Sequence, residues 1–252
     1  MSAEPSAEFL TELAARLPAA QAHLGLATDA DADRFGVMDA AGGYHDANMI
    51  LGLLLDYLIE TRSWEGGVAR SVATTHLIDR VAARHGRPVY QTKVGFKYLG
   101  EYILRDQVVM VGEESEGFSM KHHLPEKDGI LAGVLIAEMV ARKGRGLPQL
   151  LGDLFARVGP VYNQRVNLSL AVAAKEQLMA RLENPPERFA GLKVTEHVTL
   201  DGHKYILEDG SWVCFRPSGT EPVVRFYFEA SSPAGLEKLR QAGEALLREV
   251  AA

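Results

Sequence analysis

The segment of residues 67–111 constrains the fold more than any other part of the chain, because apolar runs typical of strands alternate in it with runs of helical period. Strands are predicted at residues 67–73, 88–92 and 107–111, and helices at 75–84 and 95–103. Strict alternation of this kind favours a parallel sheet whose strands are joined by crossover helices. We therefore predict an α/β domain with a mainly parallel sheet.

The pattern on either side of that segment extends the prediction. Apolar residues at helical spacing predict a helix at residues 8–20, and a short strand at 23–27 then enters an acidic loop, as in half of an α/β unit. Asp46 is placed to cap a buried helix that reaches residue 60. A long helix is predicted at residues 128–142, with a shorter one after Leu147.

The pattern changes near Gly159 and Pro160, where we place a domain boundary. Beyond it, strands are predicted at residues 162–168, 193–200, 204–207, 211–215 and 223–229, and helices at 171–182 and 233–250. Ser232 and Pro233 supply the N-cap and the first position of the last helix. This order predicts a smaller α+β domain with a mainly antiparallel sheet.

Composition limits the class of protein. With 47% hydrophobic residues, the chain of 252 residues can bury one large core or two smaller ones. A formal net charge of -6 argues against a dedicated nucleic-acid-binding protein. Cys214 has no cysteine partner, which favours a reducing compartment and hence the cytoplasm. The acidic N-terminus lacks the features of a secretory signal, and no apolar run is long enough to cross a membrane.

Three aspartates, Asp29, Asp31 and Asp33, follow the first predicted strand at every second position. In an extended loop this spacing places their carboxylates on one side, where they repel each other unless a cation lies between them. A ligand set made only of oxygens suits a hard divalent ion such as Mg²⁺. The alternatives are a solvated acidic turn and the aspartyl loop of a phosphatase. An EF-hand is excluded, because Arg34 stands where its loop needs glycine.

Two segments have the chemistry for binding phosphate. Arg34 follows the aspartates directly, and its guanidinium could reach a phosphate that bridges metal and protein; the alternative is a salt bridge to the aspartates. The segment RPSGTEP, residues 216–222, lies between two predicted strands and combines an arginine fork with hydroxyl groups and a glycine turn. Its candidate anion ligands are Arg216, Ser218, Gly219 and Thr220, with Arg225 on the next strand as a second clamp or an exposed strand residue.

The segment GEESEG, residues 112–117, follows a predicted buried strand, which is where open α/β sheets place ligand-binding loops. Glu114 and Ser115 supply acceptors and a donor that suit neighbouring sugar hydroxyls. The alternative is an acidic loop that faces solvent before a helix.

The order of DADADR, GEES and RPSGTEP resembles that of the alpha-D-phosphohexomutases, the family of phosphoglucomutase and phosphomannomutase. The segments KVGFKYL and EKDGILAGVLIAEM are also similar to family segments. The resemblance implies that hexose 1-phosphate and 6-phosphate are interconverted through a phosphoserine and a bisphosphate intermediate. It also implies a role for each loop: Mg²⁺ at Asp29, Asp31 and Asp33, catalysis at Arg34 and Lys97, and substrate binding at Glu114, Ser115, Lys127, Arg216, Ser218, Gly219, Thr220 and Arg225.

The chain departs from the family pattern at two points. No serine is followed by the His-Asn-Pro sequence of the family's phosphoserine loop, and Glu116 stands where related sugar loops often have glycine or an aromatic residue. The resemblance therefore implies a C-terminal half: a remnant of the second domain at residues 1–40, a third domain at 41–158 and a fourth at 159–252. We expect the isolated chain to be inactive, and to associate with itself or with an N-terminal half. A non-catalytic phosphosugar-binding module, half of a split enzyme and a Mg²⁺-dependent sugar phosphatase are the alternatives.

Overall fold

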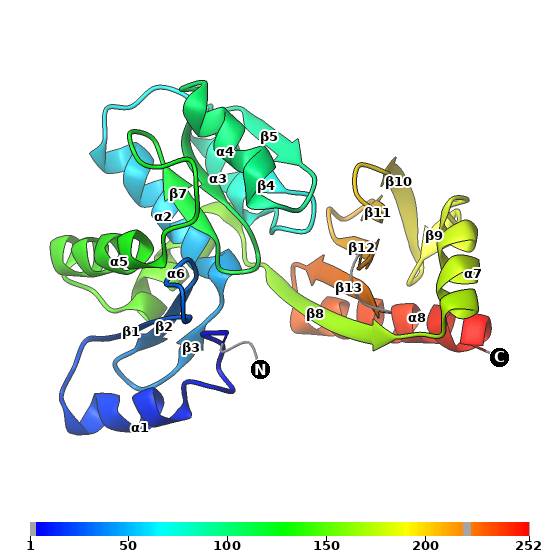
Figure 1. Cartoon of the computed structure of the whole chain (residues 1–252), viewed down its shortest axis with the longest axis horizontal. Coiled ribbons are helices and arrows are strands. Elements are labelled where there is room, and N and C mark those ends of the chain that lie inside the picture. Colours follow the sequence, from blue (N-terminus) through cyan, green and yellow to red (C-terminus); the bar gives the residue numbers. More distant parts are fainter. Residues whose placement is uncertain (1–3, 219–222, 252) are drawn as a thin grey trace. The chain divides into compact units, whose positions relative to one another are not determined.

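The computed structural model describes residues 4–218 and 223–251, and the chain divides into two compact units, Met1–Val158 and Gly159–Ala252. Figure 1 shows the order of the elements along the chain. The first unit contains the helices α1 (Thr11–Ala19), α2 (Ala47–Thr61), α3 (Leu77–Arg84), α4 (Phe96–Leu104), α5 (Gly129–Lys143) and α6 (Leu147–Val158). Its strands are β1 (Leu24–Thr28), β2 (Phe35–Asp39), β3 (Tyr44–His45), β4 (Gly67–Ser71), β5 (Val89–Thr92), β6 (Val108–Gly112) and β7 (Phe118–Met120).

The alternating segment forms the sheet β5-β4-β6-β7, in which β4 pairs in parallel with both β5 and β6. Its parallel strands and crossover helices lie where the sequence predicts them. β7 is an addition that the sequence pattern did not reveal, and it pairs antiparallel with β6. The sheet is therefore mixed, because the chain turns back through residues 113–117 before α5 begins.

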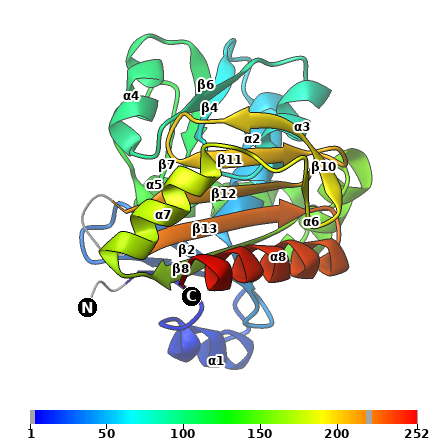
Figure 2. The ribbon, with the colours of Figure 1, turned by 90° about the vertical axis from the view of Figure 1, so that its right-hand side faces the viewer.

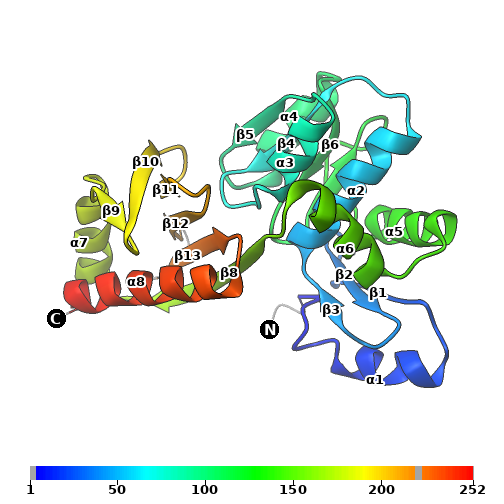
Figure 3. The ribbon, with the colours of Figure 1, turned by 180° about the vertical axis from the view of Figure 1, so that it is seen from behind.

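A separate antiparallel sheet, in the order β1-β2-β3, carries the acidic loop between its first two strands. The expectation of half an α/β unit was wrong here, because the chain returns along β2 immediately after the loop. Gly25 faces α1, where an added Cβ would lie 2.8 Å from Leu17, whereas Leu26 faces α5. Helices α1 and α5 thus cover opposite faces of this sheet, as Figures 1 and 3 also show.

Local signals explain where the long helices begin and end. The carboxylate of Asp46 accepts a hydrogen bond from the Met49 amide and caps α2, as predicted. The carboxylate of Asp128 caps α5 in the same way, through a 2.8 Å bond from Leu131. Helix α5 ends at Gly144, whose φ of 62° is favourable for glycine. None of the described helices is both long enough and apolar enough to cross a membrane.

The second unit is an antiparallel sheet in the order β8-β13-β12-β11-β10-β9 with two helices. Its elements are β8 (Tyr162–Ser169), α7 (Val172–Leu182), β9 (Arg188–Phe189), β10 (Leu192–Val198), β11 (His203–Leu207), β12 (Trp212–Pro217), β13 (Val223–Ala230) and α8 (Pro233–Ala251). Both helices cover one face of the sheet, as seen in Figure 2. The core on that face includes Phe215, Phe226 and Phe228. The short β9 was not predicted.

Candidate functional site

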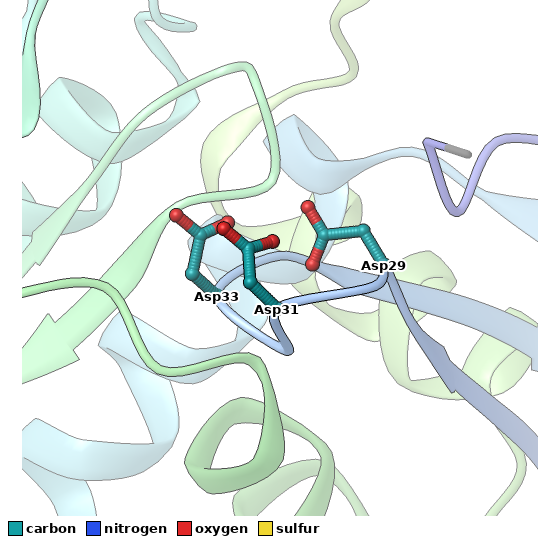
Figure 4. Close-up of side chains that lie close together, drawn as sticks. All are labelled: Asp29, Asp31 and Asp33. Carbon is teal, nitrogen blue, oxygen red and sulfur yellow. The ribbon is translucent and has the colours of Figure 1, made fainter. Parts of the chain in front are cut away.

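The carboxylates of Asp29, Asp31 and Asp33 converge, as Figure 4 shows. Each offers an oxygen that lies within 4.8 Å of the others, and this is the one group of three or more potential metal ligands within the described residues. The loop is held from inside, because Asp29 accepts a hydrogen bond from the Arg34 amide at 3.1 Å, while Ala32 adopts a left-handed φ of 59°. Three convergent carboxylates form an all-oxygen set that fits a hard divalent cation such as Mg²⁺.

The guanidinium of Arg34 is surrounded by carboxylates. Its Nη1 donates to Oε1 of Glu4 at 3.0 Å, and its Nε lies 3.7 Å from Asp29 and 3.9 Å from Asp33. The salt bridges that were the alternative to phosphate binding are therefore present. Burial disfavours the charge of Arg34, but the hydrogen bond to Glu4 and the negative charges of Glu4, Glu116 and Asp29 outweigh it and raise the pKa of this side chain. Arg34 thus stays a cation.

Main-chain hydrogen bonds join the acidic loop to two other segments. Arg34 forms an antiparallel bridge with Gly117, next to a 3.3 Å bond from the Phe35 amide to the Glu116 carbonyl. The Gly129 amide donates to the Ala32 carbonyl at 3.0 Å. An added Cβ at Gly129 would lie 2.2 Å from the Arg34 carbonyl oxygen, so only glycine permits this approach. The segments DADADR, GEESEG and EKDG, which are far apart in sequence, therefore meet in space.

Lys127 connects the same three segments through its side chain. Its Nζ lies 2.5 Å from Oδ2 of Asp33. Its aliphatic part crosses Gly117, where an added Cβ would lie 2.9 Å from the Lys127 Cδ. The substrate-binding candidate Lys127 is thus placed between the acidic loop and the segment GEESEG, the candidate sugar loop of residues 112–117.

The loop of residues 113–117 is anchored by both of its adjacent glutamates. Oε2 of Glu114 accepts hydrogen bonds from the hydroxyls of Ser71 at 2.8 Å and Thr74 at 3.2 Å, so one of its oxygens is engaged by the protein. Glu113, which sequence reasoning passed over, is buried and accepts a 2.7 Å bond from the Gly95 amide. Nothing in a run of two glutamates reveals which one turns inwards. Ser115 is half-buried beside them.

Lys97 lies in the first turn of α4 and is exposed. Its ammonium nitrogen is 4.9 Å from the centre of the Tyr98 ring. The bond between Gly95 and Glu113 ties the start of this helix to the sugar-loop candidate, but the structure does not assign Lys97 a contact with the acidic loop.

The segment RPSGTEP belongs to the second unit and joins β12 to β13. Gly219 and Thr220 lie outside the described residues. The Ser218 amide donates to the Val223 carbonyl at 2.8 Å. Arg216 and Arg225 are direct partners across the two strands, and Nε of Arg216 donates to Asp201 at 2.7 Å.

A lysine that sequence reasoning missed also reaches this segment. Nζ of Lys175, on α7, donates to the Ser218 carbonyl at 2.8 Å. No local pattern could have revealed this contact, because the helix and the loop are distant in sequence. The contact places a further positive charge beside the segment.

Residues 46–158 match the model of phosphoglucomutase/phosphomannomutase alpha/beta/alpha domain III, and residues 171–245 match the model of the C-terminal domain of the same family. The chain belongs to the phosphoglucomutase/phosphomannomutase family, and the predicted resemblance is confirmed.

Individual relatives agree with the family models. A probable phosphoglucosamine mutase of Pyrococcus abyssi is 31% identical over 247 residues, which are 98% of this chain and 52% of the relative. The structure of a putative phosphomannomutase from Thermus thermophilus has a TM-score of 0.82 and 32% identity, and the match covers 98% of this chain and 51% of that one. The chain thus spans about half the length of the relatives that it matches.

A more distant structure shares the fold alone. It is an Aspergillus fumigatus N-acetylphosphoglucosamine mutase in complex with GlcNAc-6P and magnesium, with a TM-score of 0.67 and 16% identity.

Proposed function

We propose that this chain supplies the metal, sugar and phosphate loops of a phosphoglucomutase-like enzyme that interconverts hexose 1-phosphate and hexose 6-phosphate. The observation that carries the proposal is the bridge between Arg34 and Gly117, which places the acidic loop against the sugar loop. A transferring phosphoryl group needs a cation and a positioned sugar hydroxyl at the same place. This contact supports both requirements within one unit.

In this proposal Asp29, Asp31 and Asp33 hold Mg²⁺. The bound ion would act as a Lewis acid beside the transferring phosphoryl group. Arg34 would steady the phosphoryl oxygens through its planar, charged guanidinium. The neighbouring carboxylates raise its pKa further. The bound ion would relieve the repulsion among the three carboxylates, and this relief would favour its binding to the loop.

The sugar would be held by groups of the adjoining loop. Ser115 can donate to one ring hydroxyl, and the oxygen of Glu114 that is not bonded to Ser71 can accept from another. Lys127 would contact the substrate next to Asp33, and Lys97 would assist proton transfer from the start of α4. These roles are proposals that the contacts of the loop support.

The phosphate that does not react would bind in the second unit. Its ligands would be the guanidiniums of Arg216 and Arg225, the hydroxyls of Ser218 and Thr220, and the backbone at Gly219. Asp201 orients Arg216 from the side by accepting from its Nε.

The phosphoserine of the complete reaction is not supplied by any serine motif of this chain. We therefore infer that the isolated chain has little or no turnover, and that it acts as one half of a split enzyme or as a phosphosugar-binding module. We also propose that residues 1–40 belong with the second mutase domain, residues 41–158 with the third and residues 159–252 with the fourth.

The test is calorimetric titration of glucose 1-phosphate into the wild-type chain and into Arg216→Ala. Arg248→Ala is the matched control, since that arginine is exposed on α8 and pairs only loosely with Glu244 at 3.6 Å. Binding should weaken in Arg216→Ala and stay unchanged in the control. Equal affinity in all three proteins would overturn the phosphate-site assignment, and robust mutase turnover by the isolated chain would overturn its inferred inactivity.

A further inference from the structure

Two charged centres of the first unit's candidate site, Asp33 and Arg34, already have an internal partner of opposite sign. On the cation side, Nζ of Lys127 lies 2.5 Å from Oδ2 of Asp33, with 20% of the Lys127 side chain and 26% of the Asp33 side chain exposed. On the anion side, Nη1 of Arg34 lies 3.0 Å from Oε1 of Glu4. The pair of Lys127 and Asp33 thus places an ammonium on one of the three carboxylates that are the candidate metal ligands. The second pair places a carboxylate on the guanidinium assigned to phosphate.

The main chain holds Lys127 at this position. The amide of the next residue, Asp128, donates to the Phe118 carbonyl at 3.0 Å. The amide of Gly129 donates to the Ala32 carbonyl, also at 3.0 Å. The start of α5 is therefore fixed against both loops. The ammonium reaches Asp33 from an anchored backbone, with Gly117 beneath its aliphatic part.

The main chain also holds Glu4. Pro5 is buried, and its carbonyl oxygen would lie 2.4 Å from a Cβ added at Gly36. The segment before α1 is therefore packed directly on β2, the strand that follows Arg34. This packing brings the carboxylate of Glu4 to the guanidinium.

We propose that the site is neutralised from within: Lys127 and Glu4 stand in for the incoming cation and phosphate, so that each ligand binds by displacing an internal counter-ion. The inference rests on the proposed function, in which the aspartate triad takes Mg²⁺ and Arg34 takes a phosphate. It adds that each ligand must compete with an internal ion pair in order to bind. Once displaced from Asp33, the ammonium of Lys127 becomes available to the loop of residues 112–117.

The cation half is tested by titrating Mg²⁺ alone into the wild type and Lys127→Met. Removing the competing ammonium should tighten Mg²⁺ binding by about two- to fivefold, the range expected for a partly exposed ion pair. Lys127→Arg keeps the charge and should stay within about twofold of the wild type. Lys238→Met is the control, because Lys238 is exposed on α8 and belongs to the other unit.

The anion half is tested with inorganic phosphate in an Arg216→Ala background, which removes the phosphate site of the second unit. Glu4→Gln should tighten phosphate binding by about two- to fivefold, whereas Glu8→Gln, which changes an exposed glutamate of the same segment, should not. Adding Arg34→Gln to the Glu4→Gln protein should abolish the gain. The melting temperature of each variant shows that it is folded.

The outcomes separate the two proposals. If folded Lys127→Met binds Mg²⁺ as the wild type does or more weakly, the internal-cation idea fails while the metal site stands. If Glu4→Gln and Glu8→Gln bind phosphate equally, the internal-anion idea fails. If neither the wild type nor Lys127→Met binds Mg²⁺, the metal site and this inference fail together.

Discussion

Arg216 and Arg225 lie directly opposite each other on β12 and β13, on the face of the sheet away from its helices. The neighbouring pair Phe215 and Phe226 alternates onto the helix-covered core, which fixes the direction of both arginines. Like charges at directly opposed positions destabilise a sheet. An anion held between the two guanidiniums would remove that cost, and Asp201 relieves part of it at Arg216.

Phosphate should therefore stabilise the second unit. We expect inorganic phosphate to raise the melting temperature of the wild type in a concentration-dependent way, because a ligand that binds only the folded state shifts the folding equilibrium. The rise should be much smaller in Arg225→Gln and unchanged in Arg248→Ala. Sulfate and chloride at equal ionic strength distinguish a specific oxyanion from general screening, and an identical rise in Arg225→Gln would contradict the prediction.

Gly129→Ala should destabilise the first unit. The new methyl group would lie 2.2 Å from the Arg34 carbonyl oxygen, so the acidic loop and α5 would have to separate. We expect the free energy of unfolding to fall by about 1–3 kcal/mol. Gly152→Ala is the matched control, since its Cβ would meet nothing within 4 Å and alanine favours helix, giving a gain of up to about 1 kcal/mol. Urea denaturation measures both, and equal effects would refute the steric argument.

Asp31→Asn should separate metal binding from stability. Asp31 is exposed and belongs to a triad of mutually repelling carboxylates, so without metal the variant should be at least as stable as the wild type. With Mg²⁺ the order should reverse, because only the intact triad gains stability from the ion. Thermal melts with Mg²⁺ and with EDTA check this prediction; a Mg²⁺-induced rise of equal size in both proteins would argue against the triad.

Asp56, on α2, is a buried carboxylate with two partly exposed partners, one at the end of α3 and one on α6. Its carboxylate contacts His85 at 2.7 Å and also pairs with Arg157. Asp56→Ala leaves both partners without their carboxylate and should lower the free energy of unfolding by about 3 kcal/mol. Asp153→Ala breaks an exposed pair with Arg145 and should cost at most about 1 kcal/mol. Comparable losses in the two variants would show that burial of the pair is unimportant.

Asp39 should give stability a defined pH dependence. Burial acts to raise its pKa, but hydrogen bonds from His45, Gly43 and Ala41 outweigh burial and lower the pKa of this carboxyl. A lowered folded-state pKa means that the stabilisation is complete above the unfolded value of about 3.9 and is lost as the pH falls through the folded value. The stability difference between wild type and Asp39→Asn should therefore be largest near neutral pH and shrink below about pH 4. A constant difference across denaturation curves from about pH 7 to about pH 3 would contradict this assignment.

The sequence predicted the elements wherever the local pattern was long. Strand and helix alternation across residues 67–111 identified β4, β5 and β6, and Asp46 marked the start of α2. It did not reveal β7 or β9, because three and two residues are too few to show a period. Strand β2 was also missed, and with it the antiparallel return after the acidic loop.

For the candidate site, the sequence named residues but not their partners. The convergence of Asp29, Asp31 and Asp33 was predicted, although a turn with Ala32 at a left-handed φ of 59° produces it rather than an extended loop. The contact between Lys127 and Asp33 depends on how α5 packs. The contact from Lys175 to Ser218 likewise joins parts of the chain that no local motif links. Long-range pairing of this kind is decided by tertiary packing.

The shared backbone bonds between the acidic loop and the segment of residues 116–118 also bear on local motion. A loop that opens must break the bond from the Phe35 amide to the Glu116 carbonyl, and that rupture frees a donor on one segment and an acceptor on the other. Hydrogen–deuterium exchange in the two segments should therefore rise and fall in step. A ligand that contacts only one of the two segments would slow exchange in the other as well. Binding of a cation at the acidic loop would then lower the exchange rate at residues 116–118 without any change in the average structure.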